Sequence, residues 1–427
     1  MYIKSPYTYI YMNTIQKIHA REILDSRGNP TIELEMILDN GMKAWSSVPS
    51  GASTGIHEAH ELRDGGERMN GKGVRKAIQN IHDIIAPAII GMDVQNQAEI
   101  DQKMIELDGT ENKSRLGANA ILAVSLAVAR LGAMTQGKKL YQHIADLSGQ
   151  QAKMTRPFFN IINGGKHAGN ELAFQEFMIS PNFDSFSKNY FVAAEVYAQL
   201  KKDLKEKFGG AATLLGDEGG FAPDHLNDVE ATLNLLMEAI RKAGYEGQVD
   251  IALDVAASEF YQGGKYNLGF KSGANDFKTV DEMIKLYETI VEKYPIISIE
   301  DPFDQDDFES FARLREIMEA KNVQVVGDDL TVTNTKRIQQ AIDQKSCNAL
   351  LLKINQIGTV SEAIEAFKLA KSDGWKVMIS HRSGETTDDF IADFAVGVGS
   401  EQIKSGATAR GERVVKYNRL LAIEEQL

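Results

Sequence analysis

Apolar and polar residues alternate along most of residues 31 to 38, in the sequence TIELEMIL. A period of two is typical of a β-strand with one buried face, because successive side chains point to opposite faces. The turn-forming sequence Asp39-Asn40-Gly41 follows, and a second extended run, MKAWSSV, comes after it. This pattern predicts a β-hairpin near the start of the chain.

Helical spacing replaces the alternation from residue 74 to about residue 147, where apolar residues recur every three or four positions. Gly109 and Gly117 divide this stretch into several helices. Together with the hairpin, these helices predict an α+β domain over residues 13–148. Residues 1–12 lack the continuous apolar core and the cleavage site of a signal peptide, and we interpret them as a tail.

The least polar stretch of the chain runs from residue 118 to residue 134 and still contains Asn119 and Arg130. It is short and polar for a bilayer span, which needs about 20 predominantly apolar residues. We therefore expect a buried helix, capped by Ser114, and no transmembrane segment.

Five short apolar runs follow in the second half of the chain, and each stops at a polar residue before a helical pattern begins. The runs end at Asp254, Glu300, Asp328, Lys353 and His381. The last three gaps, of 28, 25 and 28 residues, match a strand plus a crossover helix, and the first, of 46, leaves room for a hairpin at YQGGKYNLGF. Serial units of this length predict an α/β fold with a parallel sheet, most economically a closed β/α barrel over residues 149–427.

The carboxyl ends of parallel barrel strands meet at one face, where the active sites of such barrels lie. Asp254, Glu300 and Asp328 fall there, although each alone has a plainer interpretation as a helix cap or a surface residue. Three carboxylates at one barrel mouth repel one another unless a cation lies between them. An all-oxygen ligand set selects a hard ion such as Mg²⁺, and the sequence offers no Cys/His cluster for zinc.

Lys353 follows three leucines, and a lysine in such a place is rarely buried without a partner or a task. Beside a metal ion its pKa would be lowered, so that it could accept a proton near neutral pH as a general base. A lysine that reaches solvent from a strand tip is the alternative.

Further segments combine cations or hydroxyls with glycines. The run His381-Arg382-Ser383-Gly384 presents donors suited to phosphate, although a solvated surface loop is the alternative. Lys404 follows another strand-like run and is available to a substrate carboxylate. The Gly-rich segment 50–55 lacks the lysine and spacing of a nucleotide P-loop, and we expect a mobile lid there.

The formal net charge of −13 argues against nucleic acid and anionic membrane surfaces as partners. Positive charge for an anionic ligand must then be local, supplied by metal ions and a few placed cations. The only cysteine, Cys347, excludes an intrachain disulfide, which favours the reducing cytoplasm as the location.

Long blocks in chain order resemble the enolase family. They are DSRGNPT (25–31), VPSGASTGIHEA (48–59), NGGKHAGN (163–170), QEFM (175–178), LLGDEGGFAP (214–223), ALDVAASEF (252–260), SIEDPF (298–303), GDDLTVTN (327–334), LLKINQIGT (351–359) and SHRSGET (380–386). The resemblance runs from about residue 13 to the end and is far more specific than any single motif.

This resemblance implies an eight-stranded, TIM-like β/α barrel with a smaller N-terminal α+β capping domain. It also implies the activity of a phosphopyruvate hydratase, the reversible dehydration of 2-phosphoglycerate to phosphoenolpyruvate in glycolysis and gluconeogenesis. Members of the family are homo-oligomers, generally dimers and in some cases octamers, and the same is expected here.

Matched to the family's motifs, the metal and catalytic residues fall at positions already singled out and at three others. The resemblance implies one Mg²⁺ held by Asp254, Glu300 and Asp328, and a second, substrate-associated Mg²⁺ reached by Ser53 of the lid. Lys353 would be the base that removes the proton from C2. Glu218 would be the acid that assists loss of the C3 hydroxyl, with Glu176 in support.

The same matching implies the substrate-binding residues. Arg382 and Ser383 would hold the phosphate and Lys404 the carboxylate. His167 and Gln175 would complete the pocket, and His381 would line it.

Two other interpretations compete. Another enolase-superfamily enzyme, such as an acid dehydratase or racemase, would share the barrel and the metal acids but use a Lys-x-Lys base. Lys205 and Lys207 are the candidates for that motif, in a charge-rich run typical of a solvated helix face. A non-catalytic, enolase-like surface-binding protein is the second alternative, and the presence of every predicted catalytic residue argues against it.

Overall fold

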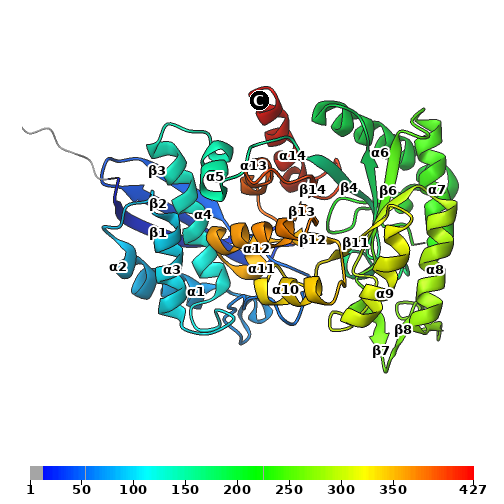
Figure 1. The fold of residues 1–427 in the computed structure, drawn as a ribbon, viewed down its shortest axis with the longest axis horizontal. Helices are drawn as coiled ribbons and strands as arrows, with labels where there is room; N and C mark the ends of the chain where they lie inside the picture. The colour runs from blue at the N-terminus through cyan, green and yellow to red at the C-terminus, as the bar shows by residue number, and fades with distance from the viewer. Residues whose placement is uncertain (1–12, 53, 225) are drawn as a thin grey trace, which may run out of the picture.

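The structure, a computed structural model, describes residues 13–52, 54–224 and 226–427. The predicted tail, residues 1–12, and the predicted metal ligand Ser53 lie outside these ranges. Within them, a small domain with an antiparallel sheet lies beside a closed barrel (Figure 1). The expected fold class is therefore confirmed.

The antiparallel sheet of the small domain has the strand order β1-β2-β3. Its strands are β1 (Ile15–Leu24), β2 (Pro30–Leu38) and β3 (Lys43–Ser47). β2 and β3 form the predicted hairpin. The sequence did not reveal β1, because the pairing register shifts between Ile15 and Lys17 and interrupts the period of two.

Helices pack against this sheet. The helical segments of the small domain are η1 (Arg68–Gly71), α1 (Arg75–Asn80), η2 (Ile81–Ile85), α2 (Ala86–Ile89), α3 (Gln97–Asp108), α4 (Ala118–Thr135) and α5 (Leu140–Ser148). α4 contacts β2 and β3, and 83% of its residues are buried inside the protein, although its length and composition alone would suit a membrane span. As predicted, it is a core helix.

The N-terminus of α4 differs from the prediction. Its cap is Gly117, whose φ of 97° favours glycine, and not Ser114. The carboxylate of Asp108 accepts the N–H of Leu116 at 2.6 Å just ahead of the helix. This bond orders the turn ahead of the helix, and the Gly117 cap itself has no side-chain hydrogen bond.

The barrel closes in the strand order β10-β11-β12-β13-β14-β4-β5-β6. Its strands in chain order are β4 (Arg156–Asn163), β5 (Glu176–Pro181), β6 (Val249–Asp254), β10 (Ile296–Glu300), β11 (Gln324–Gly327), β12 (Ala349–Leu352), β13 (Lys376–Ser380) and β14 (Gln402–Lys404). The five predicted strands are β6 and β10 to β13. Each ends at, or one residue before, its predicted polar residue.

β5 departs from the predicted parallel sheet. It pairs antiparallel with both β4 and β6, whereas the remaining pairs in the barrel are parallel. The link from β4 to β5 is a loop with one short 3₁₀ helix, η3 (Gly165–His167). It has no room for a crossover helix, and the chain therefore reverses direction.

Helices surround the barrel in the described part of the chain. They are α6 (Phe186–Phe208), α7 (Val229–Lys242), α8 (Val280–Lys293), α9 (Phe308–Glu319), α10 (Thr335–Asp343), α11 (Ile354–Ile357), α12 (Val360–Ser372), α13 (Phe390–Gly397) and α14 (Gly411–Glu424), with the short η4 (Gly210–Thr213) and η5 (Ala257–Phe260). The expected hairpin after β6 is present as a small sheet of β7 (Tyr261–Gln262), β8 (Lys265–Asn267) and β9 (Phe277–Lys278).

The barrel interior below the carboxyl ends of its strands is filled by apolar side chains. This apolar plug consists of Phe158, Met178, Ala252, Val326, Ala349, Leu351 and Met378. Towards the amino ends of the strands, the amide of Gln324 donates to Ser298 Oγ at 3.0 Å and to Gln402 Oε1 at 2.9 Å. The interior is therefore packed, and the carboxyl end of the barrel, here called the mouth, is left for polar groups.

Polar contacts join the small domain to the barrel. Asp101 accepts a hydrogen bond from Ser361 Oγ at 2.6 Å, and Arg130 pairs with Asp388 at 2.7 Å. Ser50 forms an isolated antiparallel bridge with Gly384 on the loop after β13. The expected lid segment therefore begins directly beside the mouth.

Candidate active site

One cavity at the mouth is lined by nearly all the predicted site residues. Its lining includes His167, Gln175, Glu176, Glu218, Asp254, Asp328, Lys353, His381, Arg382, Ser383 and Lys404. Glu300 does not line the cavity but contacts Lys404 from below its floor. Residues at or next to the mouth ends of all eight barrel strands, far apart in sequence, thus meet at one place.

Lys404 has partners that differ from the expected substrate carboxylate. Its Nζ lies 2.8 Å from both carboxylate oxygens of Glu300, 3.3 Å from Glu176 Oε2 and 3.5 Å from Asp254 Oδ2. Burial disfavours the ammonium, but Glu176, Glu300 and Asp254 hold the pKa of Lys404 well above its usual value. In the protein alone, Lys404 therefore supplies the positive charge that two of the predicted metal acids require.

Lys353 pairs with Asp328 at the side of the cavity. The other Asp328 oxygen accepts from Gln356 Nε2 at 2.8 Å. Burial lowers the pKa of Lys353, but the carboxylate of Asp328 outweighs it, so that the pKa is raised above the usual value. The predicted depression is therefore absent in the protein alone, because the negative charge of Asp328 stabilises the ammonium of Lys353.

Two buried acids at the mouth were not predicted, Asp301 and Asp329. Asp301 accepts the backbone N–H of Asp328 at 2.9 Å and that of Asp329 at 2.7 Å. Carboxylate oxygens of Asp301, Asp328 and Asp329 lie within 4.8 Å of one another. Burial, followed by the charge of neighbouring carboxylates, raises the pKa of both Asp301 and Asp329 well above its usual value.

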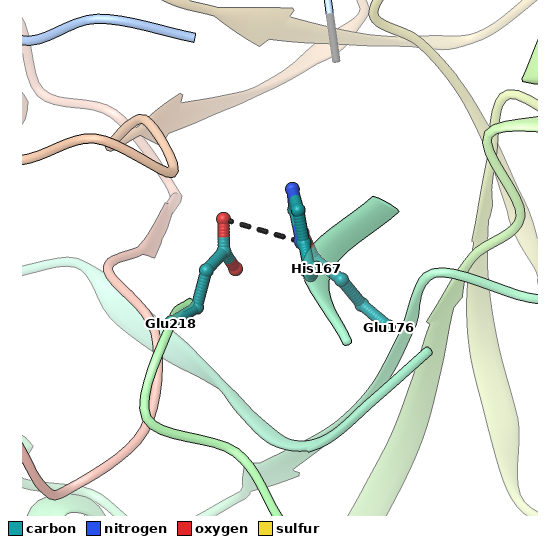
Figure 2. A group of neighbouring side chains, drawn as sticks. All are labelled: His167, Glu176 and Glu218. Atoms are coloured by element: carbon teal, nitrogen blue, oxygen red, sulfur yellow. Dashed lines mark ion pairs between the residues drawn. The ribbon is translucent and has the colours of Figure 1, made fainter. Parts of the chain in front are cut away.

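A second polar group contains His167, Glu176 and Glu218. Figure 2 shows the three side chains converging, with the imidazole of His167 next to Glu218. Nδ1 of His167 lies 3.5 Å from Glu218 Oε1 and 3.6 Å from Glu176 Oε1. Burial lowers the pKa of His167, so the imidazole is neutral at neutral pH.

The two carboxyls of this group differ in their tendency to hold a proton. Burial and the charge of Glu218 raise the pKa of Glu176 well above its usual value. Burial also acts to raise the pKa of Glu218, but the surrounding His167, His381 and Arg413 hold it well below. The two carboxyls titrate as a pair, and these opposite shifts favour the protonated form at Glu176 over that at Glu218.

Arg382 and Ser383, the residues expected to bind phosphate, both line the cavity. The guanidinium of Arg382 pairs with both oxygens of Glu58, at 2.8 and 3.1 Å. Ser383 Oγ accepts the backbone N–H of Ala52, in the lid segment, at 2.6 Å. A Cβ on Gly51 would lie 2.0 Å from Arg382 Nη2, so glycine is required for the lid to approach this closely.

The donor set at the mouth fits a hard divalent cation. Its acids are oxygen ligands, and burial raises the pKa of Glu300 well above its usual value, as expected of crowded carboxylates without enough counter-charge. Gln175 Oε1 and His167 Nδ1 are buried without a hydrogen-bond partner among the described residues. Such atoms are satisfied by a polar ligand that the protein alone does not supply.

The alternative Lys-x-Lys base does not lie at the mouth. Lys205 and Lys207 are exposed on the last turn of α6, and Lys207 pairs with Glu238 on α7 at 2.7 Å. They therefore belong to the outer helical layer, as a solvated face would.

Comparisons with known proteins show the family of the chain. The family model described as "Enolase, N-terminal domain" matches residues 15–144, and "Enolase, C-terminal TIM barrel domain" matches residues 151–427. The chain is 55% identical to an enolase of Mastigamoeba balamuthi, over 97% of this chain and 96% of the relative. It is 56% identical to an enolase of Solanum lycopersicum, again over 97% of this chain and 96% of the relative.

Proposed function

The chain belongs to the enolase family and is a phosphopyruvate hydratase, and from that premise we propose how its own residues carry out the dehydration of 2-phosphoglycerate. The observation that carries the proposal is the single cavity in which Lys353, Glu218 and the Arg382–Ser383 corner meet the acids of the mouth. Each group then has one task in the reaction.

Substrate binding uses the two cationic corners of the cavity. Arg382 and Ser383 bind the phosphate, with the lid segment closing over it through Ala52. Lys404 binds the substrate carboxylate, which requires that another cation neutralise Glu300 and Asp254. His167 and Gln175 satisfy their buried atoms on the remaining substrate oxygens, and His381 lines the pocket.

Proton transfer uses Lys353 and the Glu176–Glu218 pair. The neutral amine of Lys353 accepts the C2 proton, and the electron pair of the C–H bond passes into the substrate carboxylate. The C3–O bond then breaks and the Glu176–Glu218 pair donates a proton to the departing hydroxide, which leaves as water. Glu218 would be the donor, after it receives a proton from Glu176 by way of His167, which lies close to both carboxyls.

A pair of Mg²⁺ ions fits this donor set. One would be held by Asp254, Glu300 and Asp328, and the second, with the substrate, by Ser53, which lies outside the described residues. Bound there, they supply positive charge that stabilises the doubly charged carboxylate formed when C2 loses its proton. Compensation of Asp328 would also lower the pKa of Lys353 towards the range of a working base.

The test is the appearance of phosphoenolpyruvate absorbance after addition of 2-phosphoglycerate, with Mg²⁺ and with a chelator. Lys353→Ala should lower kcat by about 10²–10⁴-fold, the usual contribution of a general base. Lys336→Ala, which removes a lysine that is 77% exposed, is the matched control and should have no effect. Chelator-resistant turnover, or normal turnover by Lys353→Ala in folded protein, would reject the assignment.

We also propose that the protein is a cytoplasmic homo-oligomer, a dimer or an octamer. The family resemblance supports the oligomer, and a single buried cysteine suits a reducing compartment. Light scattering at working concentration tests the first point, and a monomer mass would contradict it. Cell fractionation with activity assays tests the second.

A further inference from the structure

Arg413, on α14, is a fully buried arginine that the reaction scheme does not use. α14 packs against α13 and α6 (Figure 1), and the side chain of Arg413 reaches the loops at the mouth. Its Nη1 donates to the carbonyl of Arg382 and its Nη2 to the carbonyl of Ser383. The guanidinium thus holds the main chain of Arg382 and Ser383, the residues proposed to bind the phosphate.

The same guanidinium holds a second loop, the one that carries Glu218. Nη2 donates to the carbonyl of Asp217 at 3.1 Å, directly before Glu218 in the chain. A third loop packs on the stem of the side chain, because a Cβ on Gly406 would meet Arg413 Cδ at 2.9 Å and the carbonyl of Glu218 at 2.5 Å. Three loops around the substrate cavity therefore converge on one side chain.

Arg413 also determines which nitrogen of His381 carries the proton. Nη1 of Arg413 lies 2.6 Å from His381 Nδ1. A guanidinium only donates hydrogen bonds, so Nδ1 must be the acceptor and the single proton of a neutral imidazole is on Nε2. Nε2 lies 3.2 Å from Glu218 Oε2.

The partners of Arg413 are unusual for a structural arginine. A buried guanidinium is ordinarily matched by a carboxylate that forms two parallel hydrogen bonds with it. Here its terminal nitrogens meet main-chain carbonyls, an imidazole and the hydroxyl of Ser26, while Glu412 approaches only Nε, at 3.4 Å. The side chain is therefore arranged around the active-site loops and not around a counter-ion.

We propose that Arg413 is a positioning residue that holds the phosphate-binding loop and the Glu218 loop in register and fixes His381 in the Nε2–H tautomer directed at Glu218. One side chain would then link the group that anchors the phosphate to the group that protonates the leaving hydroxide. The inference rests on the roles proposed above for Arg382, Ser383 and Glu218.

The tautomer is tested by ¹⁵N NMR of histidine-labelled protein without substrate. We expect the His381 signals of the wild type to show a protonated Nε2 and a bare Nδ1, with assignment from their loss in His381→Gln. In Arg413→Met, which keeps a long apolar stem, the tautomer should become mixed or reverse. A protonated Nδ1 in the wild type would overturn the proposal without any variant.

The kinetic test separates positioning from general stability. Arg413→Met should raise KM for 2-phosphoglycerate and lower kcat by about tenfold each, because small misplacement of two loops affects both binding and proton transfer. Arg413→Lys, which keeps a buried donor, should recover part of both losses. Arg419→Met, on the same helix, removes a two-bonded pair with Asp393 far from the cavity and should leave kcat and KM unchanged.

Failure of the positioning role of Arg413 can be distinguished from failure of the proposed catalytic mechanism. An unchanged His381 tautomer together with unchanged kcat and KM in Arg413→Met would reject the positioning role while leaving the assignment of Lys353 intact. A changed tautomer and KM together with normal activity of Lys353→Ala would instead reject the proposed mechanism. If Arg413→Met does not fold, the wild-type tautomer and Arg413→Lys still decide the question.

Discussion

The apolar plug and the mouth are two layers of the same barrel strands, and burial has opposite effects on their stability. Ala252 in the apolar plug and Asp254 at the mouth are two residues apart on β6, as are Leu351 and Lys353 along the chain leaving β12. Two residues along a strand cover only about 6.6 Å. Apolar burial stabilises the plug by itself, whereas the mouth is stable only when its charges are matched.

Burial alone does not distinguish the mouth, where the predicted site residues lie, from the apolar plug. Leu351 is 0% exposed, and the side chains of Lys404 and Glu300 are only 2% and 1% exposed. What separates the layers is the source of stabilisation. Removal of a plug side chain should therefore affect mainly folding, and a change at the mouth should depend on metal and on pH.

The largest effect is expected when the mouth loses its own cation. Lys404→Met keeps the length of the side chain but leaves Glu300 and Asp254 without a counter-charge, which should lower the unfolding free energy of the metal-free protein by about 3–5 kcal/mol. Chemical denaturation with and without Mg²⁺ measures it, and Mg²⁺ should recover part of the loss. Lys376→Met, at the exposed start of β13, is the control. Equal stability of Lys404→Met and wild type would contradict the counter-ion role.

A cavity in the apolar plug should lower the stability of the protein and leave its activity nearly unchanged. Leu351→Ala should cost about 2–4 kcal/mol of unfolding free energy, because the packed interior relaxes only partly around the lost atoms. Since the plug does not touch substrate, kcat of the folded variant should stay within about twofold of wild type. Denaturation and initial rates measure the two quantities. A large fall in kcat with little loss of stability would remove the distinction between the layers.

The pH dependence of stability should differ between metal-free and metal-loaded protein. Burial raises the pKa of Glu300 and Asp329, so the folded protein retains protons that the unfolded chain releases. Stability of the metal-free protein should therefore fall as pH rises from about 4.5 towards the raised values, by about 1.4 kcal/mol per pH unit for each retained proton.

Mg²⁺ should flatten that slope, because it stabilises the ionised carboxylates. Calorimetric Tm values from pH 5 to pH 8, with chelator and with Mg²⁺, measure the difference. Glu300→Gln, which cannot ionise, serves as the matched variant and should show a weaker slope without metal. Parallel curves with and without Mg²⁺ would show that the raised acids do not bind it.

The smallest effects are expected on the outer helices. Lys205→Ala and Lys207→Ala should leave kcat unchanged and alter stability by less than about 1 kcal/mol, because exposed ion pairs such as Lys207–Glu238 contribute little. Steady-state kinetics and thermal denaturation suffice. A loss of activity in either variant would revive the Lys-x-Lys alternative and would show that charge outside the mouth takes part in the chemistry.

Residues of the mouth could be predicted from sequence where the strand continues regularly up to them, because side chains then alternate between the two faces. Asp254 and Glu300 end apolar runs, so their inward position follows from the strands themselves. Asp301 was missed because, in a continuing strand, the residue after an inward side chain points outward. Its φ of 41° shows that the strand has already ended, and the turn brings this second acid into the same cluster.

Electrostatic balance was the part that sequence could not provide. The expected fall in the pKa of Lys353 and the expected partner of Lys404 both depend on distances between segments that are remote in the chain. Likewise, β5 could not be assigned a direction from its apolar pattern, because a buried strand has the same pattern whichever way it runs. The elements follow from local pattern, and these details follow from the closed barrel.

β14 has a consequence for how the protein is made. It is the barrel strand that leaves the ribosome last, and it lies between β13 and β4, the first strand. Until β14 is inserted, β13 and β4 present unpaired edges, and Glu300 and Asp254 lack the ammonium of Lys404. Barrel closure and the neutralisation of Glu300 and Asp254 therefore wait until β14 has been synthesised, and a nascent chain that stops before β14 has neither.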